Sequence, residues 1–338
     1  MSDNKNIIVT GGAGYIGSHT CKALSASGYT PVVIDNLSKG HQDAVKWGPL
    51  EQVDIRNTPA ISQILSTYAP KAIIHFAALS EVGESVKDPA KYFDNNVGGS
   101  LSLLQAMRSS SVKNIVFSSS CSVYGEPQRI PIDEDTPCQP VNPYGTSKYM
   151  VELFLEDFRK AYGLNYASLR YFNACGADPD GEIGERHDPE THLIPRALMV
   201  AAGLENGLNL FGEDYNTPDG TCVRDYIHVN DLATAHIKAL EHLCHGGEPL
   251  TLNLGTGKGT SVRQIIETTE KVTGTTLPVT ISPRRKGDPA SLVANPRKAR
   301  EVLGFETEWN DLEKIIRTAW NFLSPYWEQK SERIKNSG

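Results

Sequence analysis

Long hydrophobic runs and clusters of basic residues are both missing from this sequence. Its longest apolar stretches, such as residues 193–204, are interrupted by charge, which argues against a membrane-spanning helix. The N-terminal segment lacks the cationic flank, apolar core and small-residue cleavage site of a secretion signal. With 33 basic and 40 acidic residues the net charge is -7, and no Lys/Arg run resembles a nucleic-acid or lipid patch. We therefore expect a cytoplasmic protein without nucleic-acid or membrane partners.

Paired cysteines and metal-binding motifs are missing as well. The six cysteines include no C-x-x-C pair, so we expect reduced thiols that serve mostly in packing. Two histidine clusters, His187 with His192 and His242 with His245, have no partners at a familiar zinc spacing. The sequence therefore predicts ordinary surface histidines and no metal site.

Short apolar runs rich in β-branched residues alternate with helical patterns in the first half of the chain. Such runs of four to eight residues are typical of buried strands, and strands that alternate with helices indicate βαβ units. The fold class is therefore predicted to be α/β, with a doubly wound parallel Rossmann-type sheet covered on both faces. The expected strands are residues 6–10, 30–35, 71–78, 113–120 and 165–172, and the expected helices are residues 15–27, 58–68, 96–109 and 147–161.

The composition changes after residue 175. Residues 176–192 are rich in glycine, proline and charge, so a smaller C-terminal α/β substrate domain is expected to begin there. We accordingly expect a Rossmann domain over residues 1–175 and a substrate-binding domain over residues 176–338. Segments near 224–255 include a good helix and a buried strand pattern, so they are candidates to return to the first sheet.

A glycine-rich turn follows the first predicted strand. Gly11, Gly14 and Gly17 give the spacing G-x-x-G-x-x-G, which allows a tight turn, a close approach to a pyrophosphate and packing of the helix on the strand. The next strand ends in Asp35, near the distance expected for a carboxylate that binds a ribose hydroxyl. Because a carboxylate repels the extra phosphate of NADP, NAD is favoured. Lys39 is the only nearby cation that could weaken this preference.

A second set of polar residues points to chemistry on a hydroxyl group. Residues 118–120 are serines at the end of a predicted strand, and Tyr144 and Lys148 lie one helical turn apart. An ammonium and a positive nicotinamide both favour the phenolate, which could then accept a proton from an alcohol. Taken singly, the serines could be a strand-end cap and the tyrosine a buried aromatic. The other Tyr-x-x-x-Lys match, Tyr326 with Lys330, has no preceding strand and reads as structural.

A dozen motifs in order resemble the UDP-glucose 4-epimerase family of extended short-chain dehydrogenases/reductases. They run from Ile7 to about Trp320 and include TGGAGYIGSH, HFAA, FSSSCSVYG, NPYGTSK, LRYFNACGA, FGEDYNTPDGTCVRDYIHVNDLA, LNLGTGKG and PRRKGDP. The resemblance implies that UDP-glucose and UDP-galactose are interconverted through a 4-keto sugar by an isomerase with tightly bound NAD. It further implies that Tyr144 takes the proton of the 4-hydroxyl, that Lys148 lowers the pKa of Tyr144, and that Ser120 assists.

The resemblance also carries over binding residues and an assembly. It implies a homodimer formed by two helices from each subunit, one of them beginning near Tyr144. For NAD it implies Gly11, Gly14, Tyr15, Ile16, Gly17, Asp35, Asn36, Asp54, Ile55, Phe76, Ala77, Ala78, Asn95, Ser120, Tyr144, Lys148 and Phe172. For the UDP-sugar it implies Ser120, Tyr144, Asn173, Leu193, Phe211, Arg224, Arg285, Asp288 and Leu292. Guanidinium groups suit bidentate contact with a diphosphate, although an arginine followed by an acid, as in Arg224-Asp225, is more often a structural ion pair.

Three positions depart from the pattern of the family. Ser80 stands where some relatives have a phosphate-binding lysine, which leaves that NAD contact open. His192 replaces an asparagine that contacts the uridine side in some members. Leu292 falls at a position thought to gate the size of the sugar pocket, and it is smaller than a tyrosine and larger than a serine. Glucose and galactose are therefore the first expectation.

Other activities remain open to different degrees. A UDP-N-acetylhexosamine, UDP-pentose or UDP-hexuronate 4-epimerase uses the same machinery. A 4,6-dehydratase needs an acidic residue beside the serine, where this chain has Cys121 and Ser122. A non-catalytic NAD- or UDP-sugar-binding regulator is expected to lose Tyr144 or Lys148, and this chain has both.

Overall fold

The computed structural model describes residues 4–285 and 288–336. Strands and helices alternate in the first half of the chain, as predicted, with three short irregular helices between them. The first half contains β1 (Asn6–Thr10), α1 (Tyr15–Ala26), β2 (Thr30–Ile34), η1 (Gln42–Ala44), β3 (Leu50–Glu51), α2 (Thr58–Tyr68), β4 (Ala72–His75), α3 (Val82–Lys87), α4 (Pro89–Tyr92), the π-helix η2 (Phe93–Gly98), α5 (Gly99–Arg108), β5 (Asn114–Ser120), η3 (Cys121–Tyr124), α6 (Pro143–Tyr162) and β6 (Asn165–Tyr171).

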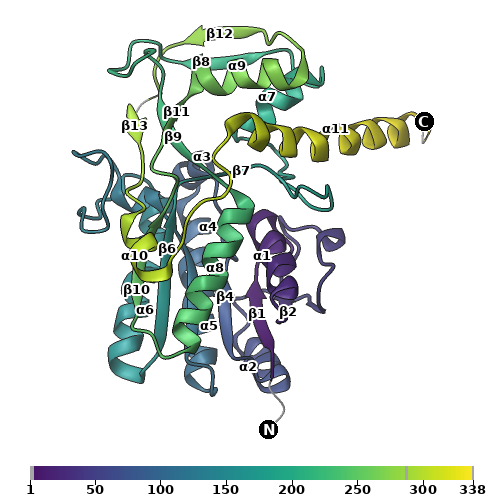
Figure 1. Cartoon of the computed structure of the whole chain (residues 1–338). Coiled ribbons are helices and arrows are strands. Elements are labelled where there is room, and N and C mark those ends of the chain that lie inside the picture. The colour runs from purple at the N-terminus through teal and green to yellow at the C-terminus, as the bar shows by residue number, and fades with distance from the viewer. Residues whose placement is uncertain (1–3, 286–287, 337–338) are drawn as a thin grey trace.

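The second half is less regular. It contains β7 (Asn173–Cys175), α7 (Leu193–Ala201), β8 (Leu208–Phe211), β9 (Val223–His228), α8 (Val229–Cys244), β10 (Leu250–Leu254), β11 (Gly259–Ser261), α9 (Val262–Thr273), β12 (Val279–Ser282), β13 (Ser291–Leu292), α10 (Arg297–Leu303) and α11 (Leu312–Asn336). Figure 1 shows β8, β12, α7 and α9 above the main sheet, whereas α8, α10 and β10 lie at its level, and α11 projects to one side.

The main sheet has seven strands in the order β10-β6-β5-β4-β1-β2-β3. Every neighbouring pair is parallel, which confirms the predicted doubly wound sheet. The order reverses between β1 and β4, where the connections leave in opposite directions. Strand β10 comes from the second half of the chain and pairs with β6 at the sheet edge. The carboxyl ends of all these strands therefore meet at one edge.

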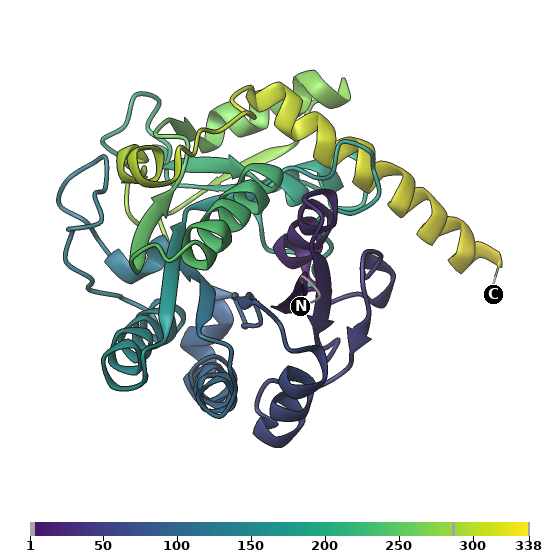
Figure 2. The ribbon, with the colours of Figure 1, turned by 60° about the horizontal axis from the view of Figure 1, so that its bottom comes forward.

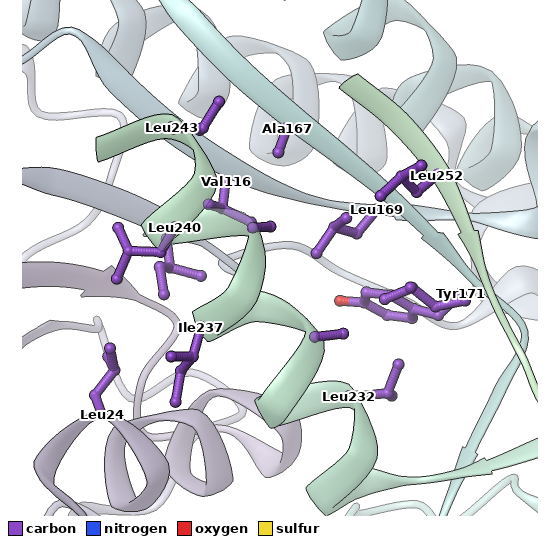
Figure 3. Packing of buried hydrophobic residues seen from close by; sticks show 14 of the residues in the cluster. Leu24, Val116, Ala167, Leu169, Tyr171, Leu232, Ile237, Leu240, Leu243 and Leu252 are labelled. Carbon is purple, nitrogen blue, oxygen red and sulfur yellow. The ribbon is translucent and has the colours of Figure 1, made fainter. Parts of the chain in front are cut away.

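Helices cover both faces of this sheet, as Figure 2 shows. Because successive side chains of a strand point to opposite faces, Ile7 and Val9 pack on one face and Ile8 on the other. The first face is covered by α1 and α8, and the second by α2, α5 and α6. In Figure 3, Leu232, Ile237 and Leu240 of α8 lie against side chains of the sheet.

The start of α6 differs from its predicted position. The expected helix covered residues 147–161, whereas α6 begins at Pro143. Asn142 caps the helix, since the backbone N–H of Gly145 donates to its side-chain oxygen at 2.8 Å, and Pro143 suits the first turn. Tyr144 and Lys148 thus both lie in the first turns of one helix.

The described residues include no helix long and apolar enough to cross a membrane. All six cysteines carry free thiols, and four of them are buried.

A stability measurement tests whether α8 is part of the main core. Leu240→Ala removes a side chain that is 0% exposed and packs in the sheet-facing cluster. We expect a loss of about 3 kcal/mol in the free energy of unfolding, because the substitution leaves a cavity. Thr234→Ala, on the exposed side of the same helix, should change it by less than about 0.5 kcal/mol. Urea denaturation measures both, and equal effects would contradict this packing.

Candidate active site

The glycine turn between β1 and α1 packs too closely against neighbouring backbone to admit side chains. Gly11 has a φ of +71°, and a Cβ atom there would lie 2.6 Å from the backbone nitrogen of Ala77. A Cβ atom on Gly17 would lie 2.2 Å from the carbonyl oxygen of Gly11. Gly14 precedes α1 without a side-chain cap, so no side chain occupies the helix N-terminus. These features fit a pyrophosphate held against the N–H groups of the helix.

Asp35 follows β2 at the same edge and is held by the backbone. Its two carboxylate oxygens accept from the N–H groups of Ala13 at 3.1 Å and Leu37 at 2.8 Å. Burial raises its pKa, and these two hydrogen bonds oppose the rise. Lys39 pairs with Glu81 at 3.2 Å instead of with Asp35. Lys39 therefore does not neutralise the carboxylate that favours NAD over NADP.

Asn36 and Asp54 lie together beyond this carboxylate. The side-chain amide of Asn36 donates to Asp54 at 3.0 Å, and Arg56 also binds Asp54 at 2.7 Å. The Arg56 guanidinium holds the pKa of Asp54 well below its usual value. The neighbouring Ile55 is buried against Gly99 of α5.

The chain turns sharply after β4, so the strand is shorter than predicted. The N–H groups of Phe76 and Ala77 both donate to the carbonyl oxygen of Thr10, at 2.9 and 3.1 Å. This turn brings Phe76, Ala77 and Ala78 beside the glycine turn, where the resemblance placed them. The ring of Phe76 also packs 4.7 Å from that of His236, centre to centre.

The π-helix places two asparagines beside the start of α6. Asn95 donates to the side chain of Asn96 at 3.0 Å, and Asn96 bonds to Leu79 and to Ser147 of α6. Such π-turns are common at functional sites, because the extra residue re-aims neighbouring side chains. Sequence periodicity assigned these residues to an ordinary helix.

Three further residues assigned to NAD lie at the same edge of the sheet. The hydroxyl of Tyr15, in the first turn of α1, donates to the carbonyl oxygen of Gly176 at 2.6 Å. Ile16, next to it, packs against the cluster on the α1 face. Phe172 follows β6, is 7% exposed and packs with Cys121.

The serine-ended strand and the Tyr/Lys pair meet at the carboxyl edge of the sheet. The Nζ atom of Lys148 donates to the carbonyl oxygen of Ser118 at 2.7 Å and lies 5.9 Å from the ring centre of Tyr144. Ser120 ends β5, and its hydroxyl forms a hydrogen bond with Tyr144. The same hydroxyl accepts from the N–H of Ser122 at 3.2 Å. The structure thus brings Ser120, Tyr144 and Lys148 together.

The electrostatics of this trio differ from the expectation. Burial raises the pKa of Tyr144 to about 12, and the hydrogen bond with Ser120 only partly opposes the rise. Burial also lowers the pKa of Lys148 to about 7, against the attraction of Glu152. The expected lowering of the Tyr144 pKa by Lys148 is therefore not found, because desolvation weakens the charge of the lysine and disfavours the phenolate.

The residues assigned to the UDP-sugar gather in the second half of the fold. Arg224 of β9 pairs with Asp288 at 2.7 Å. Arg285 lies over the ring of Phe211 at 3.9 Å from its centre, and the N–H of Asp288 donates to the carbonyl oxygen of Arg285 at 3.3 Å. Asp225, the sequence neighbour of Arg224, instead accepts from the backbone of residues 256–257 and 294. The alternative of a local Arg224–Asp225 pair is therefore wrong.

Leu292 connects this half to the catalytic edge. It lies opposite Arg224 in the parallel pair β13–β9 and packs with Cys121 and Phe172, next to Ser120. Asn173 begins β7, and Leu193 begins α7. Leu292 thus lies between β9 and the residues that follow the serine-ended strand.

His187 and His192 lie at the surface, as predicted, but they pair with two carboxylates that the sequence analysis did not connect with them. Their Nδ1 atoms lie 3.1 and 2.7 Å from one carboxylate oxygen of Glu185, and Glu190 lies close to both. These carboxylates raise the pKa of His187 to about 9 and that of His192 well above its usual value. One possible ligand atom from each of the four residues lies within 4.8 Å of the others, close enough to hold a metal ion. The spacing E-x-H-x-x-E-x-H was the missed signal.

The second histidine cluster and the second Tyr-x-x-x-Lys match lie away from this edge. His242 and His245 of the α8 end bond to backbone carbonyl oxygens at 2.9 and 2.7 Å. Tyr326 lies in α11 with the guanidinium of Arg186 5.3 Å from its ring centre. The side chain of Lys330 lies outside the described residues.

Known proteins match the chain along nearly its whole length. Residues 7–255 match the model of the NAD dependent epimerase/dehydratase family. A UDP-glucose 4-epimerase from Rhizobium meliloti (strain 1021) is 53% identical over 321 residues, which cover 95% of this chain and 98% of that relative. The UDP-glucose 4-epimerase of Brucella ovis, solved in complex with NAD, is 56% identical, with a TM-score of 0.93 and coverage of 95% and 98%. A UDP-glucose-4-epimerase from Stenotrophomonas maltophila with bound NAD and formylated UDP-arabinopyranose is 41% identical, with a TM-score of 0.93 and coverage of 96% and 99%.

Replacing Gly17 tests the dinucleotide cradle. In Gly17→Ala the new methyl group would meet the carbonyl oxygen of Gly11 and displace the turn. We expect the NAD content of the purified variant to fall at least about 10-fold below that of the native protein, because the turn can no longer approach the pyrophosphate closely. Gly83→Ala is the control, since nothing lies within 4 Å of its Cβ position. NAD released by acid is quantified by chromatography, and a full NAD content in Gly17→Ala would refute this function of the turn.

Proposed function

The chain belongs to the NAD dependent epimerase/dehydratase family, and we propose that it interconverts UDP-glucose and UDP-galactose by inverting carbon 4 of the sugar. The observation that carries the proposal is the meeting of Ser120, Tyr144 and Lys148 at the carboxyl edge of a dinucleotide-type sheet. The arginine-bearing half of the fold lies above that edge. The protein is therefore an isomerase that uses NAD as its cofactor.

The two halves of the chain would hold different parts of the reacting complex. The glycine turn and Asp35 suit the pyrophosphate and ribose of NAD, and they belong to the unit of residues 1–175, to which α8 and β10 return. Residues 176–338 otherwise supply Arg224 and Arg285, whose guanidinium groups suit the diphosphate of UDP. When bound, NAD supplies the acceptor and donor of the hydride at carbon 4. Its positive nicotinamide also supplies the charge that the phenolate of Tyr144 requires.

Tyr144 is the proton-transfer group of the proposed reaction. Its hydroxyl takes the proton of the 4-hydroxyl of the sugar as that oxygen becomes a carbonyl, and it returns the proton after the carbon has been inverted. Ser120 is bonded to Tyr144 and donates to the same sugar oxygen. The ammonium of Lys148 lies 5.9 Å from the ring centre of Tyr144 and favours its phenolate. Inversion requires the 4-keto sugar to turn over while UDP stays bound, so the arginines must hold the diphosphate through both half-reactions.

Relatives of this chain do not all act on the same sugars, so a second substrate class deserves a specific test. One solved neighbour, at 38% identity, is a UDP-Glc/GlcNAc 4-epimerase, and the S. maltophila neighbour carries a UDP-arabinopyranose derivative. Leu292 packs beside Cys121 and Phe172, where a side chain of leucine size restricts the pocket less than an aromatic ring would. Glucose and galactose remain the proposed substrates, with UDP-N-acetylhexosamine and UDP-pentose as the alternative.

We propose that the enzyme works in the cytoplasm as a homodimer. The free thiols of all six cysteines fit a reducing compartment. The dimer would pair α5 and α6 of one subunit with those of its partner. In support, Leu153 of α6 is 49% exposed and offers an apolar side chain for such a contact.

Loss of the Tyr144 hydroxyl tests the chemistry. Purified native protein should convert UDP-galactose to UDP-glucose without added NAD, and Tyr144→Phe should lose at least about 100-fold in kcat while UDP affinity stays within about twofold. Tyr326→Phe is the matched control and should keep native turnover, because Tyr326 lies in α11 beside Arg186. Inactive native protein that contains NAD would reject the proposed function. Near-normal turnover of Tyr144→Phe would reject only the proton transfer.

A charge placed on α6 tests the proposed dimer. Leu153→Asp should convert the native dimer to a monomer, because it would bury a carboxylate in the apolar contact. Leu204→Asp is the control, since Leu204 is 45% exposed but lies in the other half of the fold. Light scattering after size-exclusion chromatography gives the masses. A native monomer, or a Leu153→Asp variant that stays dimeric, would contradict the assignment.

A further inference from the structure

A buried ion pair that the proposed mechanism does not use lies one helical turn beyond Lys148. Glu152 of α6 and Arg170 of β6 are 8% and 6% exposed. The Nε atom of Arg170 donates to one oxygen of Glu152 at 2.9 Å, and its Nη2 atom donates to the other at 2.6 Å. This bidentate geometry fixes the position of both side chains, and burying two charges is costly unless both are fully bonded.

The same pair ties α6 to the ends of three strands. The hydroxyl of Ser119 on β5 donates to Glu152 at 2.6 Å, so the residue directly before Ser120 is bonded to the helix that carries Tyr144. Arg170 donates to the hydroxyl of Tyr124 at 2.9 Å, and Tyr124 donates to Asn253 of β10 at 2.7 Å. One carboxylate on α6 therefore sets the rotation of the helix against β5, β6 and β10.

Few other charges surround Lys148. On α6 it faces Tyr144 and Glu152, and Arg170 reaches it only through Glu152. From β4 it faces His75, whose pKa burial lowers to about 3, so that imidazole is neutral at working pH. From β6, Tyr171 bonds to Ser118, and burial holds its pKa far above its usual value. Among these described groups, only Glu152 carries a negative charge.

We propose that Glu152 is a positioning residue for the catalytic lysine, and that its carboxylate, held by Arg170 and Ser119, fixes α6 against the strand ends and keeps Lys148 an ammonium. This inference rests on the proposed epimerase function, since it assigns Glu152 to the same site. Glu152 touches neither the sugar nor the reacting proton in this account. Glu152 acts on the reaction by setting the charge and the position of Lys148.

Glu152→Gln removes the charge and keeps nearly the same shape and an acceptor for Ser119. Without the carboxylate, less attraction favours the ammonium of Lys148, so the lysine loses its proton at lower pH. At high pH, kcat of the NAD-loaded enzyme should fall as Lys148 loses its proton, and we call this fall the alkaline limb of kcat. In Glu152→Gln we expect this limb to lie about one pH unit lower, with kcat at pH 8 reduced about 10-fold. NAD content and UDP affinity should stay within about twofold of native, which separates this effect from a loosened fold.

Two further variants distinguish charge from packing. Glu156→Gln, one turn further along α6 and bonded to the exposed Arg159, should leave the alkaline limb at its native pH. Arg170→Met leaves the carboxylate of Glu152 unpaired, so the limb should move up, opposite to Glu152→Gln. If Arg170→Met does not fold, Arg170→Lys keeps a positive charge and should show a native limb with lower thermal stability. The proposal would be overturned if the alkaline limb of kcat stayed at its native pH in Glu152→Gln. It would also be overturned if Arg170→Met or Arg170→Lys moved that limb to lower pH.

A readout without turnover separates this proposal from the proposed function. Lysine side chains labelled with ¹³C report the protonation of Lys148 by NMR in native protein and in Glu152→Gln. A lower titration midpoint in the variant supports the role of Glu152 even if no UDP-sugar is converted. An unchanged midpoint overturns it even if the native protein is an active epimerase.

Discussion

The burial of a lysine ammonium at the carboxyl edge of the sheet is the constraint on which the rest of the site depends. Lys148 is 3% exposed, and burial lowers its pKa to about 7. Two features favour the charged form. The ammonium donates a hydrogen bond to the carbonyl oxygen of Ser118, and the carboxylate of Glu152 lies one turn away. The start of α6 at Pro143, under the cap of Asn142, puts Tyr144 one helical turn before this charge. The architecture of strand ends and helix start thus determines the electrostatics of the reacting groups.

The fold and the trio of reacting residues could be predicted from sequence because their signals are local. Apolar runs, the glycine spacing and the serine-ended strand each report on a few neighbouring residues, and parallel strands bring their carboxyl ends together whatever the details. Other features depend on contacts between distant segments. The partner of Arg224 is Asp288, 64 positions away, and neighbouring residues in the sequence do not indicate it. The raised pKa of Tyr144 could not be predicted either, because it depends on how much water α6 and the strand ends exclude.

The structure separates chemistry from selectivity. The reacting groups sit on β5 and α6, which are held by hydrophobic layers on both sides and by the Glu152–Arg170 pair. Most groups assigned to the sugar nucleotide lie in the second half of the fold, where Leu292 packs against the cluster beside Ser120. A scaffold of this kind can keep one reaction while the loops change the accepted sugar. The solved neighbours with different sugars in their names fit this division of labour.

The central claim is that carbon 4 of the sugar is inverted by removing and returning its own hydrogen inside a closed site. The decisive measurement uses UDP-galactose with deuterium at carbon 4, incubated with the purified protein in ordinary water without added NAD. The account predicts UDP-glucose that keeps the deuterium at carbon 4, because a hydride that never meets water cannot exchange. Product that has lost the deuterium to solvent would contradict it, since the inversion would then proceed by proton removal from carbon and not by oxidation to the ketone.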